Sequence, residues 1–208
     1  MSDILCITNR KLCKENFLNR IEQIAVQHPG AIILREKDLS EEEYGNLAKE
    51  VVQICKVYKV PCILHSFTKM AVKLHVPAIH MPLPLLREMT QKEKEHFEII
   101  GASCHSVEDA IEAQKSGCTY ITAGHIFLTD CKKGLPGRGL SFLKDVCDAV
   151  QIPVYAIGGI NASNIDAIRQ AGAAGACVMS GLMACMDVKK TMQELNNKSG
   201  VHSPSSTK

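Results

Sequence analysis

Short apolar runs recur along the chain at intervals of roughly 20–30 residues, and stretches with a helical period separate them. Several of the runs follow a Pro or Gly break. They predict eight β-strands, at Ile4–Thr8, Ala31–Arg35, Cys62–His65, Ala78–Met81, Ile99–Ser103, Thr119–Ala123, Val154–Ile157 and Ala176–Met179. Because these runs are apolar throughout, they suit strands that are covered on both faces.

The stretches between the runs have the apolar spacing of helices that bury one side. The clearest predicted helices are Glu41–Val57, Val107–Ser116 and Ala162–Ala171. Gly117 follows the second helix and suits a C-terminal cap. For the third helix, Asn161 and Ser163 are alternative N-caps.

Strict alternation of strands and helices predicts a parallel sheet with helical crossovers. An open doubly wound sheet normally has a glycine-rich turn after its first strand. Here that strand ends in Thr8-Asn9-Arg10, and glycines gather late in the chain. We therefore predict an α/β fold, a single-domain (β/α)8 TIM barrel over residues 1–195, followed by a disordered polar tail over 196–208.

The composition argues against several other classes of protein. The 208-residue chain has a formal net charge of +2, no Trp and no long basic run, so we expect no nucleic-acid partner. Its start lacks an apolar stretch of signal-peptide length, and no run is long enough to span a membrane. We expect a cytoplasmic protein. The ten cysteines form no CxxC pair, so we expect reduced, mostly structural thiols.

The most informative stretch is Ala123–Leu140, which follows the sixth predicted strand and is long for a strand-to-helix loop. Long polar loops at a barrel mouth tend to be functional, although a solvated surface loop is the alternative. His125 lies beside the strand end, where an imidazole can exchange protons near neutral pH. Lys132 and Lys133 add positive charge suited to an anionic substrate, or are simply solvated.

Two further segments suggest an anion site. Gly158 and Gly159 follow the seventh strand and permit close approach of a ligand to the backbone. Met179 and Ser180 follow the eighth strand, and Ser180 with Gly181 is expected to begin the last helix. In barrels, the loops after strands seven and eight often hold a phosphate. A tight turn is the alternative interpretation of the glycine pair.

Other polar residues also lie at predicted strand ends. Arg35 either clamps a phosphate or carboxylate, or forms a rim salt bridge. Ser103 and His105 follow the fifth strand and are expected to face the mouth. His80 ends the fourth strand and is left unassigned, because a His in an apolar strand is more often a core residue. No cluster has metal-ligand spacing, so no metal or cofactor is expected.

These motifs together resemble those of a known superfamily. The order REK, GASCHSVEDA, YITAGHIFLTDCKKG, PVYAIGGI and GACVMSGL is similar to that of thiamine phosphate synthases and TenI proteins, from about residue 4 to 195. The resemblance implies a (β/α)8 barrel that binds a thiazole phosphate. The synthase branch joins a pyrimidine pyrophosphate to that thiazole and needs Mg²⁺. Aligned on His80, its two metal-binding aspartates correspond to Ser66 and Leu85 here, which are not equivalent ligands.

The other branch has a His after strand six, followed by TDCKKG, as in GHIFLTDCKKG here. This resemblance implies a thiazole tautomerase, an isomerase in which His125 shuttles a proton to give the aromatic carboxythiazole phosphate. It also implies thiazole contacts from Thr129, Asp130 and Cys131, and a phosphate site. The phosphate site comprises Gly158, Gly159, Met179 and Ser180. Arg35, Ser103 and Lys132 match positions that serve the pyrimidine pyrophosphate in synthases.

Two alternatives to the tautomerase remain open. One is a thiamine phosphate synthase with a displaced metal site, and the other is a non-catalytic TenI-like regulatory protein that kept the pocket. A homodimer is plausible for a small barrel.

Overall fold

Eight parallel strands form a closed barrel in the computed structural model, which describes residues 2–129 and 134–197. The strands are β1 Ile4–Ile7, β2 Ala31–Leu34, β3 Cys62–His65, β4 Ala78–Pro82, β5 Ile99–Cys104, β6 Tyr120–Gly124, β7 Val154–Ile157 and β8 Gly175–Val178. Each strand pairs with its sequence neighbours, and β1 closes the ring on β8 through Leu5 opposite Cys177. The predicted (β/α)8 barrel is confirmed, and all eight strands lie within one or two residues of their predicted bounds.

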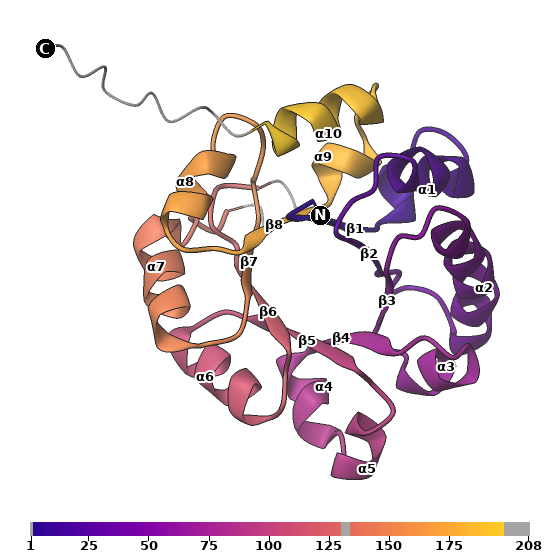
Figure 1. Ribbon diagram of the computed structural model, residues 1–208, viewed down its shortest axis with the longest axis horizontal. Helices are drawn as coiled ribbons and strands as arrows, with labels where there is room; N and C mark the ends of the chain where they lie inside the picture. The colour runs from indigo at the N-terminus through magenta and orange to yellow at the C-terminus, as the bar shows by residue number, and fades with distance from the viewer. Residues whose placement is uncertain (1, 130–133, 198–208) are drawn as a thin grey trace, which may run out of the picture.

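Helices surround the barrel as an outer ring (Figure 1). They are α1 Phe17–Ala25, α2 Glu41–Val57, α3 Thr68–Lys73, α4 Leu83–Glu88, α5 Gln91–Lys94, α6 Val107–Lys115, α7 Gly139–Ala149, α8 Ile165–Gln170, α9 Ser180–Met183 and α10 Val188–Asn196, with a short 3-10 helix η1 at Arg10–Leu12. No helix within the described residues is long and apolar enough to cross a bilayer.

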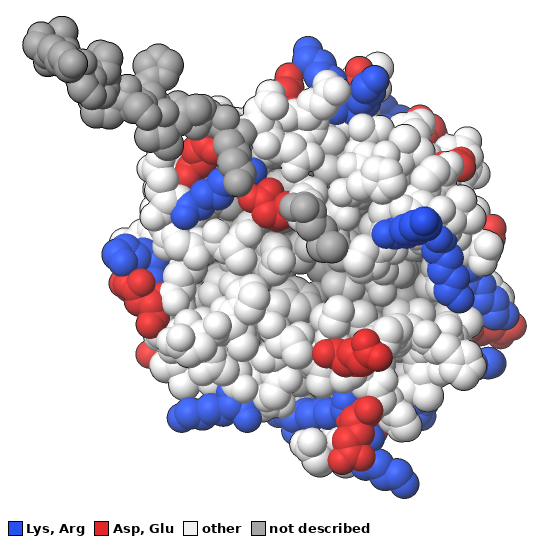
Figure 2. Space-filling view, in the orientation of Figure 1, with Lys and Arg blue, Asp and Glu red and all other residues white. Residues whose placement is uncertain are grey.

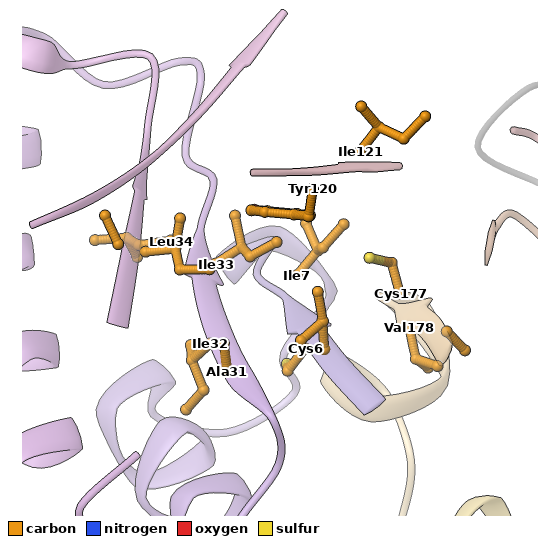
Figure 3. Packing of buried hydrophobic residues seen from close by; sticks show 14 of the residues in the cluster. Cys6, Ile7, Ala31, Ile32, Ile33, Leu34, Tyr120, Ile121, Cys177 and Val178 are labelled. Carbon is orange, nitrogen blue, oxygen red and sulfur yellow. The ribbon is translucent and has the colours of Figure 1, made fainter. Parts of the chain in front are cut away.

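The strands are covered on both faces and carry mostly apolar side chains, as the apolar runs predicted. Figure 3 shows part of this packing, with Ile33 of β2 and Cys177 of β8 on the two strands that flank β1. Ile4, Cys6, Ile32 and Leu34 are all fully buried. Cysteines in the described ranges are free thiols, and several of them fill the core as small apolar groups.

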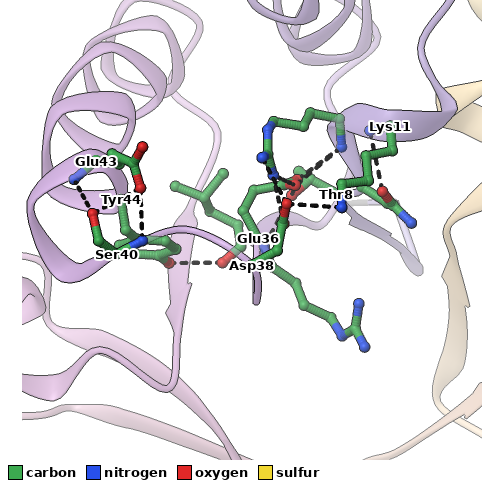
Figure 4. Close-up of polar contacts among 11 residues, drawn as sticks. Thr8, Lys11, Glu36, Asp38, Ser40, Glu43 and Tyr44 are labelled. Atoms are coloured by element: carbon green, nitrogen blue, oxygen red, sulfur yellow. Dashed lines mark hydrogen bonds and ion pairs between the residues drawn. The ribbon is translucent and has the colours of Figure 1, made fainter.

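A buried carboxylate ties the ends of the first two strands together. Glu36 follows β2 and is 3% exposed. It accepts hydrogen bonds from Thr8 Oγ1 at 2.7 Å and from the Arg10 amide at 3.0 Å, and the Arg10 guanidinium lies 3.1 Å away (Figure 4). Burial of this charge is therefore compensated by donors and by a cation.

Helix α2 has the bounds that its sequence predicted, because a capping box fixes its start. The Ser40 hydroxyl accepts from the Glu43 amide at 3.3 Å, and the Glu43 carboxylate accepts from the Ser40 amide at 2.9 Å (Figure 4). Gly117 ends α6 with φ +90° and donates to Gln114 O, as expected of a C-terminal cap.

Two helix predictions were wrong. Helix α8 begins at Ile165 instead of Ala162, because the Asn161 carboxamide accepts from the Ser163 amide and hydroxyl and stabilises a turn. Ser180 does begin a helix, but α9 has only four residues and α10 follows it. Helix α10 extends to Asn196, and residues 198–208 lie outside the described residues, so the disordered tail over 196–208 stays a prediction.

Gly175 is expected to be intolerant of a side chain, because a Cβ there would collide with Asp3 O in the contact between β8 and the chain leading into β1. We predict that Gly175→Ala lowers the free energy of unfolding by about 1–3 kcal/mol through overpacking. Urea denaturation of the variant and the wild type measures this difference in the free energy of unfolding. The control Ala174→Ser changes an exposed neighbour and should alter stability by less than about 0.5 kcal/mol. If Gly175→Ala had the same urea midpoint as the wild type, the proposed close packing between β8 and the chain leading into β1 would be contradicted.

Candidate functional site

One cavity of about 520 Å³ opens at the carboxyl ends of the strands. Parallel strands place all these ends on the same rim of the barrel, so residues distant in sequence meet there. The described site residues predicted from the sequence all line this cavity: Arg35, Ser103, His125, Thr129, Gly158, Gly159, Met179 and Ser180. Asp130, Cys131 and Lys132, also predicted as substrate contacts, lie outside the described residues.

The glycine pair after β7 adopts a conformation that favours glycine. Gly158 has φ +100° and Gly159 has φ +67°. A Cβ on Gly158 would collide with His125, and a Cβ on Gly159 would lie 2.8 Å from Phe127 Cβ. Within the described part of the chain, neither glycine amide donates a hydrogen bond. Both N–H groups are therefore available to an anion, as in other backbone anion sites.

Helix α9 is less suited to binding an anion than the sequence suggested. Its four residues align few peptide dipoles, so the macrodipole expected at Ser180 is small. Ser180 and Gly181 nevertheless line the cavity together with the glycine pair.

His125 follows β6 directly and is 7% exposed. Its backbone is held by the amide of Arg138, which donates to His125 O at 3.0 Å. In the ring, Nε2 lies 3.4 Å from Leu135 O, and the buried Nδ1 has no hydrogen-bond partner among the described residues. His125 lines the cavity beside the glycine pair, with its Cβ next to Gly158.

A buried polar chain runs beneath the cavity. The Tyr120 hydroxyl lies 2.9 Å from His80 Nδ1, and His80 Nε2 lies 2.9 Å from Ser103 Oγ. Gly101 makes room for this arrangement, because the Tyr120 ring occupies the space that a Cβ would need. His80 is thus a satisfied core residue that also orients the Ser103 hydroxyl at the cavity surface.

His65 stacks beside His80, with ring centroids 5.6 Å apart. Its Nδ1 lies 2.7 Å from Ser66 Oγ. Desolvation by burial lowers the pKa of His65 to about 2, with further lowering by His80, Arg35 and Lys37. Burial likewise lowers the pKa of His80 to about 3, again with help from the two cations. Both imidazoles are neutral at physiological pH.

Positive side chains dominate the charged lining of the cavity. Arg35, Lys37 and Arg87 line it, and Asp109 is the single carboxylate among the described lining residues. Asp109 Oδ2 accepts from the His105 amide at 2.8 Å. Figure 2 shows that charged side chains lie mostly around the perimeter of this view, while uncharged atoms surround the centre. Within the described lining, basic side chains therefore outnumber carboxylates by three to one.

The residues present do not fit a Mg²⁺ site. Hard divalent cations require several oxygen ligands, usually including carboxylates. No group of three or more His, Cys, Asp or Glu suited to a metal occurs among the described residues. Ser66 engages His65, and Leu85 is a 39% exposed apolar side chain.

Comparison with known families identifies the barrel. A family model described as thiamine monophosphate synthase matches residues 4–182. The chain belongs to this thiamine monophosphate synthase/TenI family. The match covers every strand of the barrel, so the family resemblance inferred from the motifs is confirmed.

Members of the family with similar sequences are named as synthases. The chain is 35% identical over 198 residues to thiamine-phosphate synthase 2 of Streptococcus pneumoniae, covering 92% of each chain. It is 31% identical over 195 residues to the thiamine-phosphate synthase of Clostridium tetani, covering 91% of each. Thiamine phosphate pyrophosphorylase from Pyrococcus furiosus superposes with a TM-score of 0.79 at 28% identity, covering 93% of each chain.

The assignment to the isomerases is wrong. These relatives of the family are synthases, which join substrates, and their similarity extends over nearly the whole chain. The tautomerase prediction depended on the loop GHIFLTDCKKG, part of which lies outside the described residues, and on Ser66 and Leu85 in place of the metal-binding aspartates. A histidine at a strand end is compatible with many chemistries, so His125 could not determine the reaction class.

Sequence reasoning missed three contributors to the site. Lys37 belongs to the REK motif, and its two-residue spacing from Arg35 was an available signal. Tyr120 was included in a strand, but its contact with His80 joins β6 to β4 and has no local signature. Arg87 lies in a short helix, where a basic residue ordinarily predicts a solvated face.

The two neutral imidazoles should make the protein acid-labile. Unfolded imidazoles have a pKa of about 6.5, so the unfolded chain gains protons below that pH while the folded chain does not. The contribution of the two neutral rings to the free energy of unfolding is complete above about pH 6.5. It is lost as the pH falls towards the lowered pKa values of the folded state. The loss is up to about 1.4 kcal/mol per pH unit for each ring. Urea unfolding between about pH 7.5 and 4.5 measures this slope.

Replacing one ring tests the source of that slope. His80→Gln should reduce the pH dependence of the unfolding free energy, whatever it does to stability at neutral pH. The same substitution at exposed His96 is the matched control and should leave the slope unchanged. Equal slopes in wild type and in both His80→Gln and His65→Gln would rule out the buried pair as the cause.

Proposed function

We propose that this chain is a thiamine-phosphate synthase, which joins a phosphorylated thiazole to a pyrimidine pyrophosphate and releases pyrophosphate. The supporting observation is that one cavity is lined both by the glycine pair after β7 and by basic side chains after β2. Unbonded amides of Gly158 and Gly159 suit a phosphate on one side, and Arg35 and Lys37 offer charge on another. Two anionic groups are what a coupling reaction brings together, whereas isomerisation needs one substrate.

The family relationship supports the same reaction. Relatives with 31–35% identity over nearly their full length carry the name thiamine-phosphate synthase. In this proposal the thiazole phosphate binds at the glycine pair, and His125 contacts its ring from the cavity wall. Ser103, oriented by His80, donates a hydrogen bond to the second substrate. Arg35 stabilises the negative charge that grows on the departing pyrophosphate.

A coupling assay tests the proposed reaction. Thiazole phosphate and pyrimidine pyrophosphate are supplied together, with Mg²⁺ or with EDTA, and thiamine phosphate and released pyrophosphate are quantified. We expect equal amounts of the two products, and none when either substrate is omitted. Binding of the thiazole phosphate without product in either buffer would contradict the proposal and favour the non-catalytic alternative.

Gly159→Ala should specifically impair use of the thiazole phosphate. The new Cβ would collide with Leu128 O and crowd Phe127, and a left-handed conformation disfavours alanine by about 1 kcal/mol. We expect KM for the thiazole phosphate to rise about tenfold while KM for the pyrimidine substrate changes little. Ala162→Ser, an exposed change in the same loop, is the control. Equal increases in both KM values would contradict the assignment of this loop to the thiazole phosphate.

A further inference from the structure

We infer that the cationic side of the cavity binds a pyrophosphate group directly through Arg35, Lys37 and Arg87, without a divalent cation. This inference deepens the proposed function, on which it rests, and adds Arg87 as a ligand. It concerns a part of the cavity where the metal ligands expected of a synthase are absent.

The place of those missing ligands is a hollow of about 220 Å³ next to the main cavity. Ser66, Phe67 and Leu85 line it and supply no carboxylate. Glu36 also borders the hollow, but its oxygens already accept from Thr8 and Arg10. Lys37 lines both the hollow and the main cavity, so a basic residue borders the place where a metal ion would otherwise be expected.

Arg87 extends the positive charge to the β4 side of the mouth. It lies in α4, two residues after Leu85, and lines the main cavity. Its Nε and Nη2 atoms bind the Glu112 carboxylate at 2.6 and 2.7 Å, and its side chain is still 53% exposed. Glu112 does not line the cavity, so it fixes the guanidinium at the rim without placing a carboxylate inside.

The balance of charge favours an anion over a metal ion. Three cations and one carboxylate are among the described lining residues, and when the Glu112 partner of Arg87 is also counted, the local formal charge is +1. The neutral imidazoles of His65 and His80 add none, and the pKa of each is lowered further by Arg35 and Lys37. A cation entering this region would be repelled, whereas a free pyrophosphate carries several negative charges and many acceptor oxygens.

Guanidinium groups suit this ligand in geometry as well as in charge. Arg presents a planar fork of donors that binds phosphate oxygens in pairs, and Lys adds a compact point charge. Arg35 and Lys37 follow β2 and Arg87 lies in α4 after β4, and all three residues line the same cavity, so together they can contact both phosphoryl units.

Titration of inorganic pyrophosphate into the full chain by calorimetry tests the inference. We expect binding in EDTA, with an affinity that Mg²⁺ does not improve and that falls as salt is raised. Arg87→Gln should weaken this binding by about tenfold, because a charge-assisted contact is lost. Binding that is undetectable in EDTA and restored by Mg²⁺ would overturn the inference.

Glu112→Gln separates a ligand role for Arg87 from a structural one. If Arg87 only stabilises α4 through its ion pair, both substitutions remove that pair and should weaken pyrophosphate binding equally. If Arg87 binds the anion, Glu112→Gln should leave the affinity unchanged or increase it. Lys144→Gln, which removes an exposed cation on α7, controls for net charge and should have no effect. Equal losses in the two variants of the ion pair would reject Arg87 as a ligand.

The two proposals fail in distinguishable ways. Product formation that absolutely requires Mg²⁺ would leave the synthase assignment standing and end the inference about direct binding. Pyrophosphate binding without metal, combined with no coupling in any buffer, would support direct binding and end the synthase assignment.

Discussion

The pairing of β1 with β8, called the seam here, is the constraint on which the site depends. Without this pairing, the carboxyl ends of the strands would form one edge of an open sheet. With it, they form a ring around one cavity. The seam needs a backbone approach so close that Gly175 has no room for a side chain against Asp3. A glycine with no part in ligand binding therefore helps bring the end of β2 and the ends of β7 and β8 to the same rim.

Below that rim, the barrel is filled by side chains that serve both packing and chemistry. Tyr120 fills the gap at Gly101, and its hydroxyl fixes His80, which in turn fixes Ser103. Desolvation keeps the imidazoles neutral, which avoids the cost of burying a charge beneath the cations. The cost is instead acid sensitivity, since the folded state is preferred only while these rings stay unprotonated.

Features encoded by local physics could be predicted, and features made by distant contacts could not. Doubly buried strands leave unbroken apolar runs, and the capping box of Ser40 and Glu43 fixes α2 to the residue. Parallel strands also made it possible to place Arg35, Ser103 and Gly158 at one mouth. The start of α8 was misjudged because side chains of Asn161 and Ser163 compete with helical hydrogen bonding. Tyr120 and Arg87 acquire their positions only through residues far along the chain, and the reaction class could not be read from one imidazole.

Fixed cations and a bound metal ion are two different ways to neutralise the negative charge of a pyrophosphate group. A metal that arrives with its pyrophosphate has already neutralised part of the charge, so the protein needs carboxylates to receive it. Fixed guanidinium and ammonium groups attract the bare anion, and carboxylates at the same place would weaken that attraction. Ser66 and Leu85 bring no carboxylate to the hollow, and Arg87 brings a cation to the adjoining cavity, so both features suit the proposed binding of a bare anion. If the thiazole phosphate binds at the glycine pair of the same cavity, as proposed, these cations also reduce the repulsion between the two anionic ligands.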